Sequence, residues 1–153
     1  MIDSIKRMSK RDKTQMIPQP KDGEDGLVTV DVTWGEIQPV RAAEGVQKVG
    51  ELEVIEHLEK GLPVIDVRAS GTRYGVGIPG AKAFSMAEIT DHIDQLDRTV
   101  LTIFFCNGPQ CPQSPKTIHK LLDAGYPADK IGYYRGGMHN WITLGLPVEE
   151  SGE

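Results

Sequence analysis

The sequence predicts an α/β protein in which a parallel sheet is covered by helices on both faces. Three short apolar runs, at residues 63–68, 100–105 and 131–134, have the length and side chains of buried strands. Segments with helical signals lie between and after these runs, and this alternation is typical of parallel strands joined by helices. Ligands of such sheets bind beyond the carboxyl ends of the strands. A functional site is therefore expected where these runs end.

The composition is that of one ordinary globular domain. A hydrophobic content of 39% and a charged content of 25% over 153 residues exclude a disordered or a membrane class. The net charge of −5 argues against nucleic acid or an anionic membrane as a partner. Residues 1–10 lack the apolar centre of a secretory signal, so a cytoplasmic location is expected, or a periplasmic one if a native leader was removed.

The chain has two cysteines, Cys106 and Cys111. Two are too few for a disulfide framework, and they lack the paired spacing of a zinc site. We therefore expect no metal and no other cofactor.

The first 48 residues differ from the rest of the chain. Residues 1–26 have almost no apolar pattern, and their basic residues allow a second interpretation, an arm that recruits a partner. Valines then alternate with polar residues up to Trp34, which predicts a half-buried strand. Further short strands are expected at 37–40 and 46–49. The expected divisions are a disordered tail at 1–26, a β extension at 27–48, the main domain at 49–149 and a frayed tail at 150–153.

A helix is expected at residues 51–60, where apolar residues recur at helical spacing and Gly61 provides a stop. His57 lies off the apolar stripe and is expected to face solvent. The stripe consists of Leu52, Ile55 and Leu58.

The strand at 63–68 ends in an acid and a base, and a Gly-rich loop at 69–77 follows. This loop holds Arg73. A tight turn at 78–81 and a short irregular helix at 86–96 come next.

The central unit of the sequence is a strand, a loop and a helix. The strand ends on Cys106, and seven residues later Ser114 and Pro115 suit the N-cap and first position of a helix that ends at Gly125. Unpaired N–H groups and the helix dipole stabilise an anion at such a place. The pKa of Cys106 is therefore expected to be depressed, which makes its thiol a usable nucleophile. A strand at 131–134, a turn at 135–137 and a helix at 138–144 complete the chain.

Several motifs occur in a fixed order within residues 49–149. They are VIDVR at 64–68, IPGA at 78–81, FC at 105–106 with the loop after it, LLDAGY at 121–126, YRGGMHNW at 134–141 and GLPV at 145–148. Their order and spacing resemble those of a rhodanese domain. The resemblance implies a five-stranded, largely parallel sheet and a catalytic cysteine, Cys106, that carries sulfane sulfur as a persulfide. The substrate-binding residues are then expected to be Asn107, Gly108, Pro109, Gln110, Cys111, Pro112, Gln113, Arg68 and Arg73.

The loop departs from the usual rhodanese pattern. It has seven residues between the cysteine and the serine instead of five, and it holds neither Arg nor Lys. Cys111 stands about where the usual loop arginine would be, and it has three interpretations: it resolves an oxidised or persulfidated Cys106, it receives the sulfur, or it packs. The positive charge that would stabilise an anion in the loop must then come from Lys116, Arg68, Arg73 or Arg135.

The expected function is that of a sulfurtransferase. The Cys106 thiolate takes sulfur from a small donor anion such as thiosulfate, or from a protein or small-molecule persulfide, and a thiol or cyanide accepts it. Nucleic acid and membranes are not expected partners. The alternative is a catalytically weak rhodanese-like binding or sulfur-relay module, which the neutral loop motivates. A cysteine phosphatase is excluded, because Pro112 stands where the phosphate-clamping arginine would be.

Overall fold

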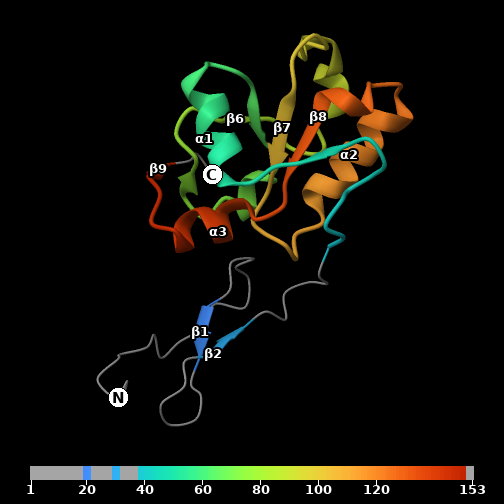
Figure 1. The fold of residues 1–153 in the computed structure, drawn as a ribbon. Coiled ribbons are helices and arrows are strands. Elements are labelled where there is room, and N and C mark those ends of the chain that lie inside the picture. Colours follow the sequence, from blue (N-terminus) through green and yellow to red (C-terminus); the bar gives the residue numbers. More distant parts are fainter. Residues whose placement is uncertain (1–18, 22–28, 32–37, 151–153) are drawn as a thin grey trace.

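A computed structural model of the protein describes residues 19–21, 29–31 and 38–150. A parallel five-stranded sheet with the order β3-β8-β7-β4-β6 forms the centre of the domain (Figure 1). The expected α/β class with a parallel five-stranded sheet is confirmed. The strands are β3 (Gln47–Lys48), β4 (Val64–Asp66), β6 (Lys82–Ala83), β7 (Thr102–Phe105) and β8 (Ile131–Tyr134).

The three inner strands end at the same edge of the sheet. Every residue of β4, β7 and β8 is buried, as expected for a parallel sheet with both faces covered. The register pairs Asp66 with Phe105, and Phe105 with Tyr134. Cys106 and Arg135 are the next residues of their strands. The sheet therefore delivers them to neighbouring positions at its carboxyl edge.

Helices cover the two faces of the sheet and create two apolar cores (Figure 1). Phe104 and Tyr133 face the core shared with α2 (Gln113–Asp123) and the 3₁₀ helix η2 (Ile89–Gln95). Phe105 and Tyr134 face the core shared with α1 (Glu51–Glu59) and α3 (Gly137–Thr143). Burying each such side chain stabilises the fold by about 1.5–3 kcal/mol.

Helix α2 ends as its sequence predicts. Gly125 adopts φ +87°, which a residue without a Cβ accepts most readily. The Gly125 N–H donates to the Leu122 carbonyl at 3.0 Å, and the Tyr126 N–H donates to Leu121 at 2.9 Å. These two bonds satisfy the last carbonyls of the helix in a Schellman motif.

The end of the described chain is paired, not frayed. β9 (Glu149–Glu150) forms an antiparallel ladder with β5 (Val76–Gly77), so the expected tail at 150–153 is corrected at Glu150. Two short 3₁₀ helices, η1 (Ser70–Thr72) and η3 (Ala128–Lys130), occupy the connections. Among the helices in residues 38–150, none combines the length and apolarity needed to cross a membrane.

The amino-terminal region differs from its prediction. β1 (Gln19–Lys21) pairs antiparallel with β2 (Thr29–Asp31), so part of the expected tail is a strand. Residues 1–18, 22–28 and 32–37 lie outside the described residues.

The stretch expected to complete the β extension belongs to the main domain. β3 is the first strand of the central sheet and pairs in parallel with β8. Val46 and Ala42 are buried in the core beneath α2. Residues 38–40 form no strand, although one was expected at 37–40.

Helix α1 buries a face that only partly matches the expected stripe, because Ile55 and Leu58 pack against the core and Leu52 does not. Val54 and His57 are buried, whereas Leu52 is 79% exposed. The His57 Nε2 lies 2.7 Å from the Leu101 carbonyl oxygen, so the ring partners a backbone group just before β7. A satisfied polar ring can be buried where an unsatisfied one cannot, and the expectation of a solvent-facing His57 was wrong.

Helix α2 begins earlier than expected. Its first residue is Gln113 and its N-cap is Pro112, because the Lys116 N–H already bonds the Pro112 carbonyl at 3.0 Å. Ser114 therefore lies inside the first turn and is buried. Pro115 is tolerated there because N–H groups of the first turn have no helical partner.

Candidate active site

Cys106 lies where β7 ends, against the first turn of α2. Its side chain is only 2% exposed. The Ser114 N–H donates to the Cys106 Sγ at 3.4 Å, and the Cys106 thiol donates to the Cys111 carbonyl at 3.5 Å. The predicted placement of a thiol at the N-terminus of a helix is confirmed, and a free helical N–H points at the sulfur.

The start of the loop is fixed by the turn before α3. The Met138 N–H donates to the Cys106 carbonyl at 3.1 Å, and the His139 N–H donates to the Asn107 carbonyl at 2.8 Å. Gly137 has φ +56°, and a Cβ there would collide with the Cys106 carbonyl oxygen. The Gly-Gly turn after β8 therefore lets α3 approach the loop closely.

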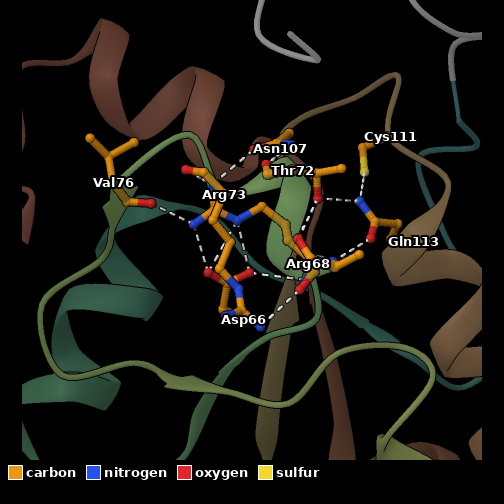
Figure 2. A network of polar contacts seen from close by, with 9 residues as sticks. Asp66, Arg68, Thr72, Arg73, Val76, Asn107, Cys111 and Gln113 are labelled. Atoms are coloured by element: carbon orange, nitrogen blue, oxygen red, sulfur yellow. Dashed lines mark hydrogen bonds and ion pairs between the residues drawn. The ribbon is translucent and has the colours of Figure 1, made fainter. Parts of the chain in front are cut away.

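Arg68 fastens this loop to the rest of the domain (Figure 2). Its side chain is fully buried, and its Nε and Nη2 grip the Asp66 carboxylate at 2.9 and 2.7 Å. The Nη2 also donates to the Val76 carbonyl at 2.6 Å. The Nη1 donates to the Arg73 carbonyl at 3.1 Å and to the Asn107 Oδ1 at 3.0 Å. All five N–H groups donate to protein groups, so none remains for the expected contact of Arg68 with substrate.

Asn107 connects the loop to the segment after β4. It is fully buried, and its Nδ2 donates to the Thr72 carbonyl at 2.8 Å while its Oδ1 accepts from Arg68 (Figure 2). Both ends of the side chain are thus occupied by protein groups. Of the predicted loop residues, Asn107, Gly108, Gln110 and Cys111 are buried, and Pro109, Pro112 and Gln113 are half-buried.

Gln113 connects the same segment to the sulfur of Cys111. Its Oε1 accepts the Ala69 N–H at 2.7 Å, and its Nε2 lies 3.3 Å from the Thr72 Oγ1 and 3.4 Å from the Cys111 Sγ (Figure 2). The amide orientation is therefore set by Ala69, and the N–H₂ is presented to the thiol.

The two cysteines form a coupled pair. Both are reduced and buried, and both belong to the core beneath α2. The Cys106 thiol donates to Cys111 and lowers the pKa of Cys111 to about 6, with help from the N–H groups of Asn107 and Gln113. Burial raises the pKa of Cys106, and the neighbouring Cys111 raises it further. The expected depressed pKa therefore belongs to Cys111 and not to Cys106.

The rhodanese-like domain family matches residues 51–144 of this sequence, which include the strand, the loop and both flanking helices of the site. The chain belongs to the rhodanese-like family. The resemblance seen in the ordered motifs is thereby confirmed.

Individual proteins are similar to this chain at low identity. An HTH-type transcriptional regulator of Mycobacterium tuberculosis is 29% identical over 99 residues, which cover 64% of this chain and 42% of the regulator. The chain thus spans about two fifths of that relative's length. The BH2092 protein of Bacillus halodurans has a TM-score of 0.58 at 23% identity, over 67% of this chain and 76% of that one. Thiosulfate sulfurtransferase of Pseudomonas aeruginosa has a TM-score of 0.57 at 24% identity, over 72% of this chain and 21% of that one.

The cations around this rhodanese-like site are held by backbone groups or exposed. The Arg135 Nε and Nη2 donate to the Gln38 carbonyl at 3.0 and 2.7 Å, and the Gln38 N–H donates to the Pro109 carbonyl at 2.7 Å. Arg73 is half-buried and donates to the Arg68 carbonyl at 3.1 Å, while its Nε has no hydrogen-bond partner among the described residues. Lys116 is exposed in the first turn of α2.

Sequence reasoning missed the Tyr133 hydroxyl near the thiol pair, and it gave the Ser114 hydroxyl only a capping role. Tyr133 lies on the same face of the sheet as the cysteines, and its pKa is raised by burial and by the nearby Cys106. The Tyr133 Oη and the Ser114 Oγ are buried without a hydrogen-bond partner in the described part of the chain. The only available signal for Tyr133 was its position in register with Phe104, two residues before Cys106. In the same residues no cluster of three or more His, Cys, Asp or Glu side chains suits a metal ion.

Proposed function

We propose that the protein is a sulfurtransferase that carries sulfane sulfur as a persulfide on Cys106. It takes the sulfur from thiosulfate or from a persulfide-type donor and passes it to a thiol or cyanide acceptor. The observation that carries this proposal is the position of the Cys106 sulfur within a rhodanese-like domain, at the end of β7 and under the Ser114 N–H. The family includes sulfurtransferases, and thiol chemistry at a helix N-terminus suits that reaction.

The reaction is a double displacement. A proton shift from Cys106 to Cys111 generates the Cys106 thiolate, which attacks the outer sulfur of the donor. A new S–S bond forms on Cys106 as the donor's own S–S bond breaks, and the remainder leaves with the electron pair. An acceptor thiolate or cyanide then takes the outer sulfur and restores the Cys106 thiolate. The Ser114 N–H stabilises negative charge on Cys106 in both steps.

The charges of the site favour a persulfide over thiosulfate as donor. Arg68 and Arg135 donate to protein groups, and the loop itself carries no basic residue. A dianion such as thiosulfate would enter a buried site without a free guanidinium from either residue. A persulfide group carries at most one charge, so the desolvation of the reacting group costs less.

The proposal is tested by sulfide formation with a dithiol acceptor, using glutathione persulfide and thiosulfate as separate donors. Wild-type protein should accelerate sulfide release, and glutathione persulfide should be the better donor. Cys106→Ser should return the rate to the uncatalysed background. A wild-type rate equal to that of Cys106→Ser with both donors would reject a sulfurtransferase.

The second candidate function is a binding or sulfur-relay module with weak catalysis. It is favoured by the burial of both sulfurs and the raised pKa of Cys106. Such a module would accept one sulfur per protein molecule but would not turn over. Quantifying bound sulfane sulfur in the protein alongside the sulfide rate separates the two candidates.

A further inference from the structure

Cys111 has surroundings unlike those of a cysteine that merely fills a core. Its sulfur receives the Gln113 side-chain N–H₂ at 3.4 Å, and the N–H groups of Asn107 and Gln113 also act on it. Gln113 is itself held by Ala69 and Thr72. A packing thiol needs no such donors, whereas a thiolate does.

The loop brings this sulfur to Cys106. The Cys111 N–H bonds the Gly108 carbonyl at 3.0 Å, which curls the loop, and the Cys111 carbonyl accepts the Cys106 thiol at 3.5 Å. The two thiols also interact directly with one another. A nucleophile therefore lies beside the sulfur that would carry the persulfide.

Access favours this internal thiol over an external one. Cys106 is 2% exposed and Cys111 is fully buried. A free acceptor thiol must diffuse into the loop to reach a persulfide on Cys106, as the donor and the final reductant also must. Cys111 is already there, and a well-oriented intramolecular nucleophile has a large effective concentration.

We propose that Cys111 resolves the Cys106 persulfide into an internal disulfide and releases hydrosulfide. The inference rests on the proposed function. The Cys111 thiolate attacks the Cys106 Sγ, and the bond between the two cysteine sulfurs forms as the bond from Cys106 to the outer sulfur breaks. The outer sulfur departs with the electron pair and its own proton as hydrosulfide. The two cysteines are oxidised from thiols to a disulfide, and the sulfane sulfur is reduced to sulfide.

An external dithiol then completes the cycle. One of its thiolates attacks the Cys106–Cys111 disulfide, its second thiol displaces the mixed disulfide, and both protein thiols are restored. The physiological acceptor would thus be a dithiol reductant, and the sulfur product would be hydrosulfide. Of the three interpretations of Cys111, the proposal therefore selects the resolving role over sulfur acceptance and simple packing.

The test follows the fate of one loaded sulfur. Wild type and Cys111→Ser are treated with glutathione persulfide, desalted without added thiol, and followed by intact mass and by sulfide assay. Wild type should lose the added sulfur, release one sulfide per protein and end two hydrogens lighter than the reduced protein. Cys111→Ser should keep the added sulfur, with a persulfide lifetime roughly a hundredfold or more longer.

Controls separate the possible failures. Equal persulfide lifetimes in wild type and Cys111→Ser would overturn the resolving role while leaving the sulfurtransferase intact. A stable added sulfur mapped to Cys111 in wild type would overturn it as well. Absence of added sulfur from both proteins would instead reject the proposed function. Cys111→Ala, with a matched thermal unfolding curve, excludes an effect of the serine hydroxyl.

Discussion

Cys106 and Cys111 lie five positions apart in one buried loop, yet the pKa values of their thiols shift in opposite directions. The difference follows from the donors around each sulfur. The Ser114 N–H is the donor placed on Cys106, whereas Cys111 has two backbone N–H groups, the Gln113 amide and the Cys106 thiol itself. Burial alone raises the pKa of a thiol, and only enough hydrogen-bond donors reverse the direction. The position next to the helix therefore does not by itself identify the thiolate.

The largest expected effect is a difference in sulfur loading between the alanine variants of the two cysteines. Cys106→Ala should abolish sulfur loading, because it removes the sulfur that receives the persulfide. Cys111→Ala should load more slowly, since the pair loses its internal proton acceptor, but it should keep the bound sulfur that wild type releases as hydrosulfide. Bound sulfane sulfur, measured over time after addition of glutathione persulfide, checks both. Loading of Cys106→Ala at the level of Cys111→Ala would contradict the assignment.

The second prediction concerns the network that holds the loop. Arg68→Met leaves the Asp66 carboxylate buried without its partner, and it releases Asn107. The free energy of unfolding should fall by about 3–5 kcal/mol, as for other broken buried ion pairs. The matched control is Lys60→Met, because the Lys60–Glu56 pair is exposed and its loss should cost far less. Denaturant unfolding measures both, and equal losses would contradict the role of Arg68.

The third prediction perturbs Cys106 without touching Cys111. Gly137→Ala places a Cβ against the Cys106 carbonyl, so it should weaken stability and sulfur loading together. Gly145→Ala is the control, because Gly145 also has positive φ but no atom lies within 4 Å of an added Cβ. Its cost should be about 1 kcal/mol from backbone strain alone. Unfolding curves and loading assays on both variants decide whether the close approach matters.

The smallest expected effect is a change in titration. Wild type should gain thiolate absorbance as the pH rises through about 6, because the acid that titrates there is Cys111. Cys111→Ala should lose this transition. Cys106→Ala should move its midpoint to higher pH, since the largest stabilising contact of the thiolate is removed. An unchanged midpoint in Cys106→Ala would contradict the coupling of the two thiols.

The fold could be predicted further than the site. Apolar runs identified β4, β7 and β8, and Gly125 and Gly145 placed the helix ends, because these signals are local. The burial of His57 depended on a carbonyl of Leu101, 44 residues away, which no local pattern reveals. The roles of the charged side chains could not be predicted for the same reason. Arg68 has the sequence context of a pocket residue, but its five donors are consumed by groups brought together only in the folded chain.

The two thiols show most clearly which properties of the site the sequence alone could not predict. The strand-to-helix position of Cys106 was predictable from β-branched residues and a proline. The lowered pKa of Cys111 was not, because it depends on how the loop curls and on where Gln113 is anchored. Candidate nucleophiles can thus be found from sequence, while their protonation requires the folded loop.

The central claim is that Cys106 carries the sulfur. Its most direct test is peptide mapping of Cys111→Ser after treatment with glutathione persulfide and trapping of free thiols and persulfides. We predict one additional sulfur atom per protein, on the peptide that contains Cys106. An unmodified Cys106 in protein that remains folded would contradict it.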